Sequence, residues 1–165
     1  MNSSRIPGLA IAALLPILLA CGDDEPTDPA TATNFTATLS GVSEVPAVTT
    51  TATGSAILSV SGATITYTVN VTDLQNDAVV AHIHVAPTGA NGPVRLNLCG
   101  TGAPEPACST TPTGVLATAT NGTTVGTPAI TFDSLLSAMR TGGAYVNVHT
   151  GANQGGEIRG QVVPN

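Results

Sequence analysis

The stretch Thr64-Ile-Thr-Tyr-Thr-Val-Asn-Val71 alternates a polar residue with an apolar or aromatic one along its whole length. Successive side chains of a β-strand point to opposite faces, so this alternation predicts a strand with one face in a core and the other in solvent. Similar runs rich in Thr, Val and Ala recur along the chain, separated by turn residues. The pattern predicts an all-β fold, an antiparallel Greek-key sandwich of about eight strands.

The individual strands can be placed by the same alternation, and one short helix interrupts them. The helix is predicted over Asp133–Arg140, because Leu135, Leu136 and Met139 share one face and Gly142-Gly143 follows its end. The predicted strands are Asn34–Ser40, Gly54–Val60, Thr64–Val71, Val79–Val85, Val94–Leu98, Gly114–Thr120, Ala144–His149 and Glu157–Val163.

The N-terminal region has the pattern of a bacterial lipoprotein signal. An apolar run from Ile6 to Ala20 is shorter than the roughly 20 residues of a membrane-spanning helix, and it ends in Leu18-Leu19-Ala20-Cys21. We expect a signal peptide over 1–20, lipidation of Cys21, a disordered tether over 21–33 and one folded domain over 34–165. The alternative is an ordinary secretory signal with an incidental cysteine.

The charge of the chain argues against nucleic acid as a partner. From Cys21 onward the sequence has ten acidic residues, three arginines and no lysine, a side-chain charge of −7. Binding to phosphates depends largely on basic residues that release counterions, and such a patch is missing. We therefore expect attachment to the membrane through the lipid alone, in the bacterial cell envelope, with the outer membrane or cell surface favoured over the inner membrane.

Two cysteines remain after Cys21. Cys99 and Cys108 flank a Gly- and Pro-rich segment, Gly100 to Ala107. In an oxidising compartment this spacing predicts a disulfide. The alternative is a metal site with two thiolate ligands.

All three histidines of the chain lie in two predicted strands. His82 and His84 are two residues apart and so project from the same face, and His149 lies on the face shared by Tyr145 and Asn147. Neutral imidazoles suit copper and zinc, so the three could form a site for one Cu or Zn ion. A structural hydrogen-bonding network without metal is expected first, the metal site second, and exposed histidines without a role third.

Sequence motifs of the common enzyme classes are missing, so we expect no catalytic residues. The chain has no phosphate-binding Gly-rich loop before a helix and no Gly-x-Ser-x-Gly turn. A Greek-key sandwich with His-x-His resembles copper–zinc superoxide dismutase, but three histidines are too few for the two metals of that enzyme.

Three blocks of the sequence resemble the signature blocks of the CHRD domain, named from chordin. They are Phe35 to Val48, Ala81 to Leu98, and Tyr145 to Val162, which contains Tyr-Val-Asn-Val-His-Thr and Gly-Glu-Ile-Arg-Gly-Gln. Two departures affect local turns: Ala47 stands where a second proline is common, and Gln154 replaces a frequent proline. The resemblance implies an immunoglobulin-like β-sandwich without established enzymatic activity, and its animal members are extracellular.

The resemblance also singles out a set of polar residues within these blocks. Besides the histidines, they are Glu44, Asn91, Asn147, Glu157, Arg159 and Gln161. The function expected first is a non-enzymatic binding or structural module of the envelope, with an unidentified protein or envelope ligand. The second is a metal-binding or metal-dependent redox protein centred on the histidines.

Overall fold

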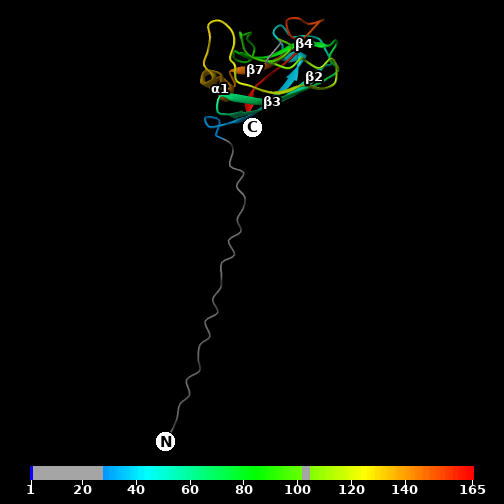
Figure 1. The fold of residues 1–165 in the computed structure, drawn as a ribbon. Helices are drawn as coiled ribbons and strands as arrows, with labels where there is room; N and C mark the ends of the chain where they lie inside the picture. The colour runs from blue at the N-terminus through cyan, green and yellow to red at the C-terminus, as the bar shows by residue number, and fades with distance from the viewer. Residues whose placement is uncertain (2–27, 102–104) are drawn as a thin grey trace.

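The structure is a computed structural model, and it describes Met1, residues 28–101 and residues 105–165 (Figure 1). Cys21, the predicted signal peptide and most of the predicted tether therefore lie outside the described residues. The described elements, in chain order, are β1 (Asn34–Ser40), η1 (Gly41–Ser43), β2 (Thr53–Ser61), β3 (Thr64–Thr72), β4 (Ala78–Val85), β5 (Val94–Cys99), β6 (Gly114–Asn121), α1 (Phe132–Arg140), β7 (Ala144–Thr150), β8 (Ile158–Gln161) and β9 (Val163–Pro164).

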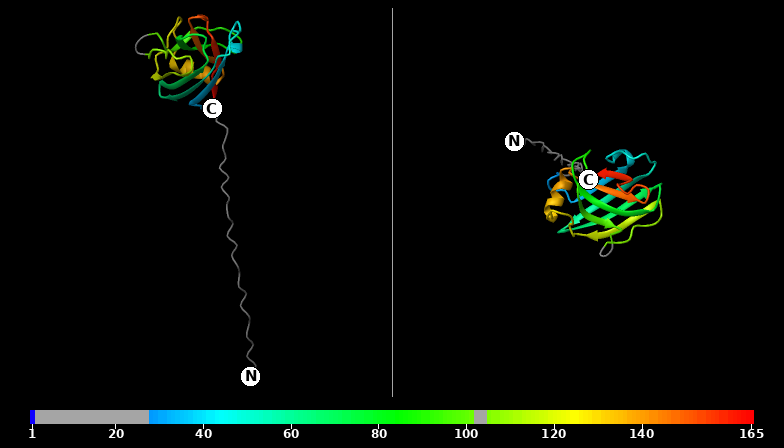
Figure 2. Two further views of the ribbon diagram at one scale, coloured as in Figure 1. Left: turned by 90° about the vertical axis from the view of Figure 1, so that its right-hand side faces the viewer. Right: turned by 90° about the horizontal axis from the view of Figure 1, so that it is seen from above.

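The strands form one antiparallel sheet that bends around the core and almost closes on itself (Figure 2). Its order is β5-β4-β7-β8-β1-β2-β3-β6, and β9 also pairs with β1. The two edge strands approach each other at a seam, where Leu96 of β5 forms an isolated bridge with Thr124 just after β6. The prediction of an antiparallel all-β fold with one short helix is confirmed, and the two layers of the expected sandwich are joined into one sheet.

The alternation that predicted the strands also defines the core. In β3, Ile65, Tyr67, Val69 and Val71 are buried, whereas the threonines between them are exposed or half-buried. The same period of two gives buried Ala81 and Ile83 in β4 and buried Val146 and Val148 in β7. Burial of these small apolar side chains is the main force that holds the sheet closed.

The strand predicted over Glu157–Val163 is divided in the structure, and this corrects the sequence analysis. β8 pairs with β7 and meets β1 at Ser40 and Arg159, whereas β9 pairs with β1 at Phe35 and Pro164. Between β8 and β9, Val162 is buried and donates its backbone N–H to the carbonyl of Ala144. β8 thus ends at Gln161 and pairing with β1 resumes in β9 at Val163, a break that an alternating sequence does not reveal.

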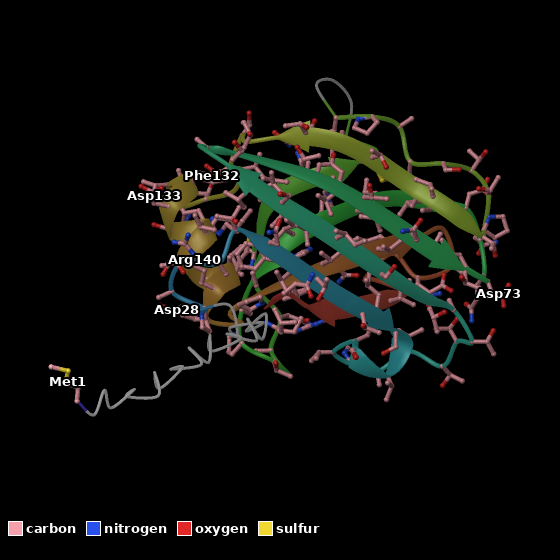
Figure 3. All side chains as sticks on the ribbon, turned by 90° about the horizontal axis from the view of Figure 1, so that it is seen from below. Met1, Asp28, Asp73, Phe132, Asp133 and Arg140 are labelled. Carbon is pink, nitrogen blue, oxygen red and sulfur yellow. A yellow bond between two sulfur atoms is a disulfide. The ribbon has the colours of Figure 1, made fainter. Side chains whose placement is uncertain are left out.

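Helix α1 lies at one end of the strands, opposite the turn at Asp73 (Figure 3). Thr131 caps its N-terminus by accepting a hydrogen bond from the backbone N–H of Ser134. Leu135 and Met139, one turn apart, are buried in the core. In the described residues, no helix is long and apolar enough to cross a membrane.

The chain begins to contact the folded domain shortly before the boundary expected at Asn34. Ala32, which belongs to the predicted tether, is 1% exposed within the core. Its carbonyl accepts a hydrogen bond of 3.0 Å from Nε of Arg140 in α1. The C-terminus returns to the same place, because the N–H of Asn165 donates to the carbonyl of Asn34. Residues 32–33 therefore belong with the folded unit.

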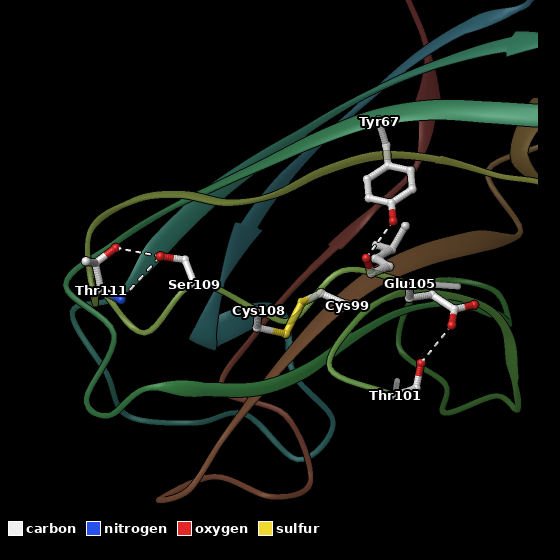
Figure 4. Close-up of a disulfide and its surroundings, with 8 residues drawn as sticks. Tyr67, Cys99, Thr101, Glu105, Cys108, Ser109 and Thr111 are labelled. Atoms are coloured by element: carbon white, nitrogen blue, oxygen red, sulfur yellow. Dashed lines mark hydrogen bonds between the residues drawn. A yellow bond between two sulfur atoms is a disulfide. The ribbon is translucent and has the colours of Figure 1, made fainter. Parts of the chain in front are cut away.

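The disulfide between Cys99 and Cys108 is formed, with Cα atoms 5.0 Å apart (Figure 4). It joins the end of β5 to the segment that leads into β6. Next to it, the buried hydroxyl of Tyr67 donates to the carbonyl of Leu98. The bond removes both thiols as metal ligands, so the alternative of a two-thiolate site is wrong.

Candidate metal centre

Strands β4 and β7 bring the three histidines together on the side of the sheet that faces away from the core. His82 and His84 point opposite to Ala81 and Ile83, which belong to the core. The two strands are hydrogen-bonded neighbours, with His82 opposite Asn147 and His149 opposite Val80. Pairing of distant segments thus places His149 beside the His-x-His pair.

The imidazoles are close enough to share one ligand. The ring centroid of His82 lies 5.6 Å from that of His84 and 5.2 Å from that of His149, and the other two are 6.0 Å apart. One nitrogen of each ring lies within 4.8 Å of the corresponding nitrogens of the others. Nδ1 of His82, Nε2 of His84 and Nε2 of His149 are all buried, and none has a hydrogen-bond partner among the described residues.

Backbone carbonyls fix two of the three rings. Nδ1 of His84 is 2.9 Å from the carbonyl oxygen of Gly92, and Nδ1 of His149 is 2.9 Å from that of Gln154. A carbonyl only accepts, so each Nδ1 carries the proton and donates it, which leaves the lone pair on Nε2. Metal-binding histidines commonly have such a partner on the nitrogen that does not bind the metal.

The surroundings keep the imidazoles neutral. Burial lowers the pKa of His82 to about 4, and the neighbouring His149 and His84 add to this effect. Burial also lowers the pKa values of His84 and His149, against the opposing effect of their hydrogen bonds to backbone carbonyls. A metal ion needs the neutral form, so the site does not have to lose protons near pH 7 before it binds.

Tyr145 lies between a histidine and an arginine. Its ring stacks on that of His84, with centroids 4.8 Å apart and planes 8° from parallel. Cζ of Arg159 lies 3.7 Å from the centroid of the same ring. Arg159 is 2% exposed, and it donates hydrogen bonds to Oδ1 of Asn91 and to the carbonyl of Ala90. The guanidinium thus holds the loop between β4 and β5.

Glu44 and Asn147 form a second buried polar pair on this side of the sheet. Nδ2 of Asn147 donates to Oε2 of Glu44 over 3.5 Å. Oε1 of Glu44 and Oδ1 of Asn147 are both buried without a donor among the described residues. A proton on Glu44 would provide a donor, and burial raises the pKa of Glu44 to about 7 despite the opposing charge of Arg159.

The remaining residues of the predicted polar set tie loops to the sheet. Asn91 donates to the carbonyl of Val45, and Gln161 donates to the carbonyls of Ala86 and Gly142. These bonds are structural and do not place either side chain among the three histidines.

Glu157 precedes β8 and is fully buried. It accepts hydrogen bonds from the hydroxyls of Thr50 and Thr150 and from the N–H of Gln75. Its carboxylate joins three segments of the chain. Neither threonine was among the predicted site residues, although Thr150 is the last residue of the quoted motif Tyr-Val-Asn-Val-His-Thr.

The chain matches the CHRD domain family over residues 35–162. This range includes the three histidines and the polar residues around them. No curated protein and no solved structure matches the chain.

Proposed function

The chain belongs to the CHRD domain family, and from that premise we propose that its domain binds one copper or zinc ion through His82, His84 and His149. Two observations carry the proposal: one nitrogen of each imidazole lies within 4.8 Å of those of the other two, and each ring has one buried nitrogen without a hydrogen-bond partner among the described residues. An acceptor buried without a partner costs about 1–3 kcal/mol, so three together would be expensive unless a ligand satisfies them. One cation bound to all three lone pairs would do so.

The donor set suits copper or zinc better than magnesium or calcium. Neutral imidazole is a ligand for zinc and copper, whereas magnesium and calcium prefer oxygen. Three protein ligands would leave a position for water or another small ligand. The hydrogen bonds of His84 and His149 to carbonyls, which a purely structural network would also use, here leave the other nitrogen of each ring free.

The role we propose is binding rather than catalysis. None of the three imidazoles is hydrogen-bonded to a serine, threonine or cysteine side chain in the part of the chain that the structure describes. A nucleophile with its general base would require such a pair. We further propose that the domain acts in the cell envelope, anchored through a lipid on Cys21, on the support of Leu18-Leu19-Ala20-Cys21 and of the disulfide.

Elemental analysis of the chain purified without chelators tests the binding proposal. We expect about one copper or zinc ion per chain, and loss of that ion after replacement of His82, His84 or His149 by alanine. The loss of affinity should exceed the roughly 10–100-fold that removal of an outer-shell partner costs. A metal-free wild-type protein that takes up neither zinc nor copper in titration would refute the proposal and favour a bound water as the donor to these nitrogens.

A further inference from the structure

Tyr145, His84 and Gly92 form a closed arrangement beside the candidate centre. The ring of Tyr145 stacks on the imidazole of His84. The hydroxyl of Tyr145 accepts a hydrogen bond of 3.1 Å from the N–H of Gly92. The carbonyl of the same glycine accepts from Nδ1 of His84 over 2.9 Å. Tyr145 therefore contacts both the face of the His84 ring and Gly92, the hydrogen-bond partner of that ring.

Gly92 has little freedom to move. A Cβ atom at this position would lie 2.0 Å from the carbonyl oxygen of Val85, so the loop backbone lies directly against the end of β4. The N–H of Val85 also donates to the carbonyl of Pro93. The hydrogen bond from the Gly92 N–H to the Tyr145 hydroxyl adds a further contact that holds Gly92 in place.

Tyr145 is itself held from its other face. Arg159 lies over that face, and its two hydrogen bonds hold Ala90 and Asn91 in the same loop as Gly92. Tyr145 is 1% exposed, so its ring has no room to turn away from His84. The loop and the ring are thus fixed by the same guanidinium.

We propose that Tyr145 is a positioning residue for the metal ligand His84. Rotation about χ2 of histidine has a broad energy profile, so an imidazole without contacts on its ring samples several orientations. The stacked tyrosine ring selects one plane, and the Gly92 carbonyl selects the orientation in which Nδ1 points to the loop. Nε2, which is buried without a hydrogen-bond partner among the described residues, is then left available to the ion. This inference depends on the proposed metal binding and adds to it a residue that would not touch the ion.

The variant Tyr145→Phe, in the purified full-length chain, removes the hydroxyl and keeps the stacked ring. Tyr67→Phe is the matched control, because it removes the other buried tyrosine hydroxyl of the chain, on the core side of the sheet. Zinc affinity is measured by competition with a chromophoric chelator and repeated with copper, and urea unfolding of each chelated protein gives its stability without metal. We expect Tyr145→Phe to weaken metal binding by roughly tenfold or more and Tyr67→Phe to leave it unchanged, although both should destabilise the fold.

Each outcome decides between the two proposals. Wild-type affinity in Tyr145→Phe would overturn the positioning of His84 through the Tyr145 hydroxyl and Gly92 and leave metal binding intact, and failure of the wild type to bind either metal would overturn both. If Tyr145→Phe does not fold, the wild-type chain labelled with 3-fluorotyrosine replaces it, since the chain has only two tyrosines. Zinc should then shift the fluorine resonance of Tyr145 but not that of Tyr67, and two unchanged resonances in the zinc-bound protein would refute the inference.

Discussion

Replacement of Glu44 by glutamine should make the domain more stable above pH 7 and remove one source of its pH dependence. The fold raises the pKa of Glu44 from 4.5 to about 7, mainly through burial. The folded protein therefore binds this proton more tightly than the unfolded chain does. The resulting stabilisation is fully present below pH 4.5 and is lost as the pH rises through 7. One pKa unit is worth about 1.4 kcal/mol, so the whole effect is at most roughly 3–4 kcal/mol.

A glutamine amide stays neutral across this range and can replace the protonated acid. Its oxygen can accept from Nδ2 of Asn147, and its NH₂ group can donate to Oδ1 of the same residue, which is unpaired in the structure. We expect Glu44→Gln to match the wild type near pH 5 and to exceed its free energy of unfolding by about 2–3 kcal/mol at pH 8.

Urea unfolding of both proteins at intervals from pH 5 to 8.5, with chelator present, measures this difference. The three histidines, whose lowered pKa values reduce stability as the pH falls below 6.5, are present in both proteins and cancel. Glu157→Gln is the control, because the Glu157 carboxylate accepts three hydrogen bonds. This variant should have a free energy of unfolding about 1–3 kcal/mol lower than the wild type at pH 8. A difference between Glu44→Gln and the wild type that does not change with pH, or a less stable Glu44→Gln at pH 8, would show that Glu44 is ionised beside Arg159.

Three further predictions concern the anchor, the disulfide and the buried arginine. Cys21→Ala should move the protein from the membrane fraction to the soluble fraction, and an unmodified Cys21 thiol in the wild type, found by mass spectrometry, would contradict the proposed anchor. Replacing both Cys99 and Cys108 by alanine should cost about 2–3 kcal/mol in denaturant unfolding, because the bond closes a short loop with a sequence separation of 9; an unchanged midpoint would disprove a stabilising role. Arg159→Ala should lower the free energy of unfolding by at least about 3 kcal/mol, since it leaves Asn91 and the Ala90 carbonyl without their charged donor. Arg140→Ala, which removes one hydrogen bond at the end of α1, should lower it by about 1 kcal/mol. Equal decreases for the two variants would argue against the proposed role of Arg159 in holding the loop.

Local pattern was enough to predict most strands, because each buries one face. β1 has the predicted bounds, and β3 extends one residue beyond them. The shared face of His82 and His84 also follows from the period of two, which holds in any strand. These features depend only on residues close together in the sequence.

The composition of the site depends on contacts between distant segments, which the sequence pattern does not encode. His149 joins the other histidines only because β4 pairs with β7, with an irregular register between Ala78 and Val80. Glu44 reaches Asn147 across 103 positions of the chain. Glu157 bonds to Thr50 and Thr150, and Thr50 lies 107 positions away in the chain. Such contacts depend on hydrogen bonds between loops and strands that lie far apart in the sequence.

The register of β1 gives the domain a direction relative to its point of attachment. The chain enters the domain next to Asn34, and the cross-strand row of Arg159, Asn147 and His82 meets β1 at Ser40, its other end. At about 3.3 Å per residue, these two ends are roughly 20 Å apart. In a protein tethered through residues before Asn34, the histidines would thus lie on the half of the domain remote from the point of attachment.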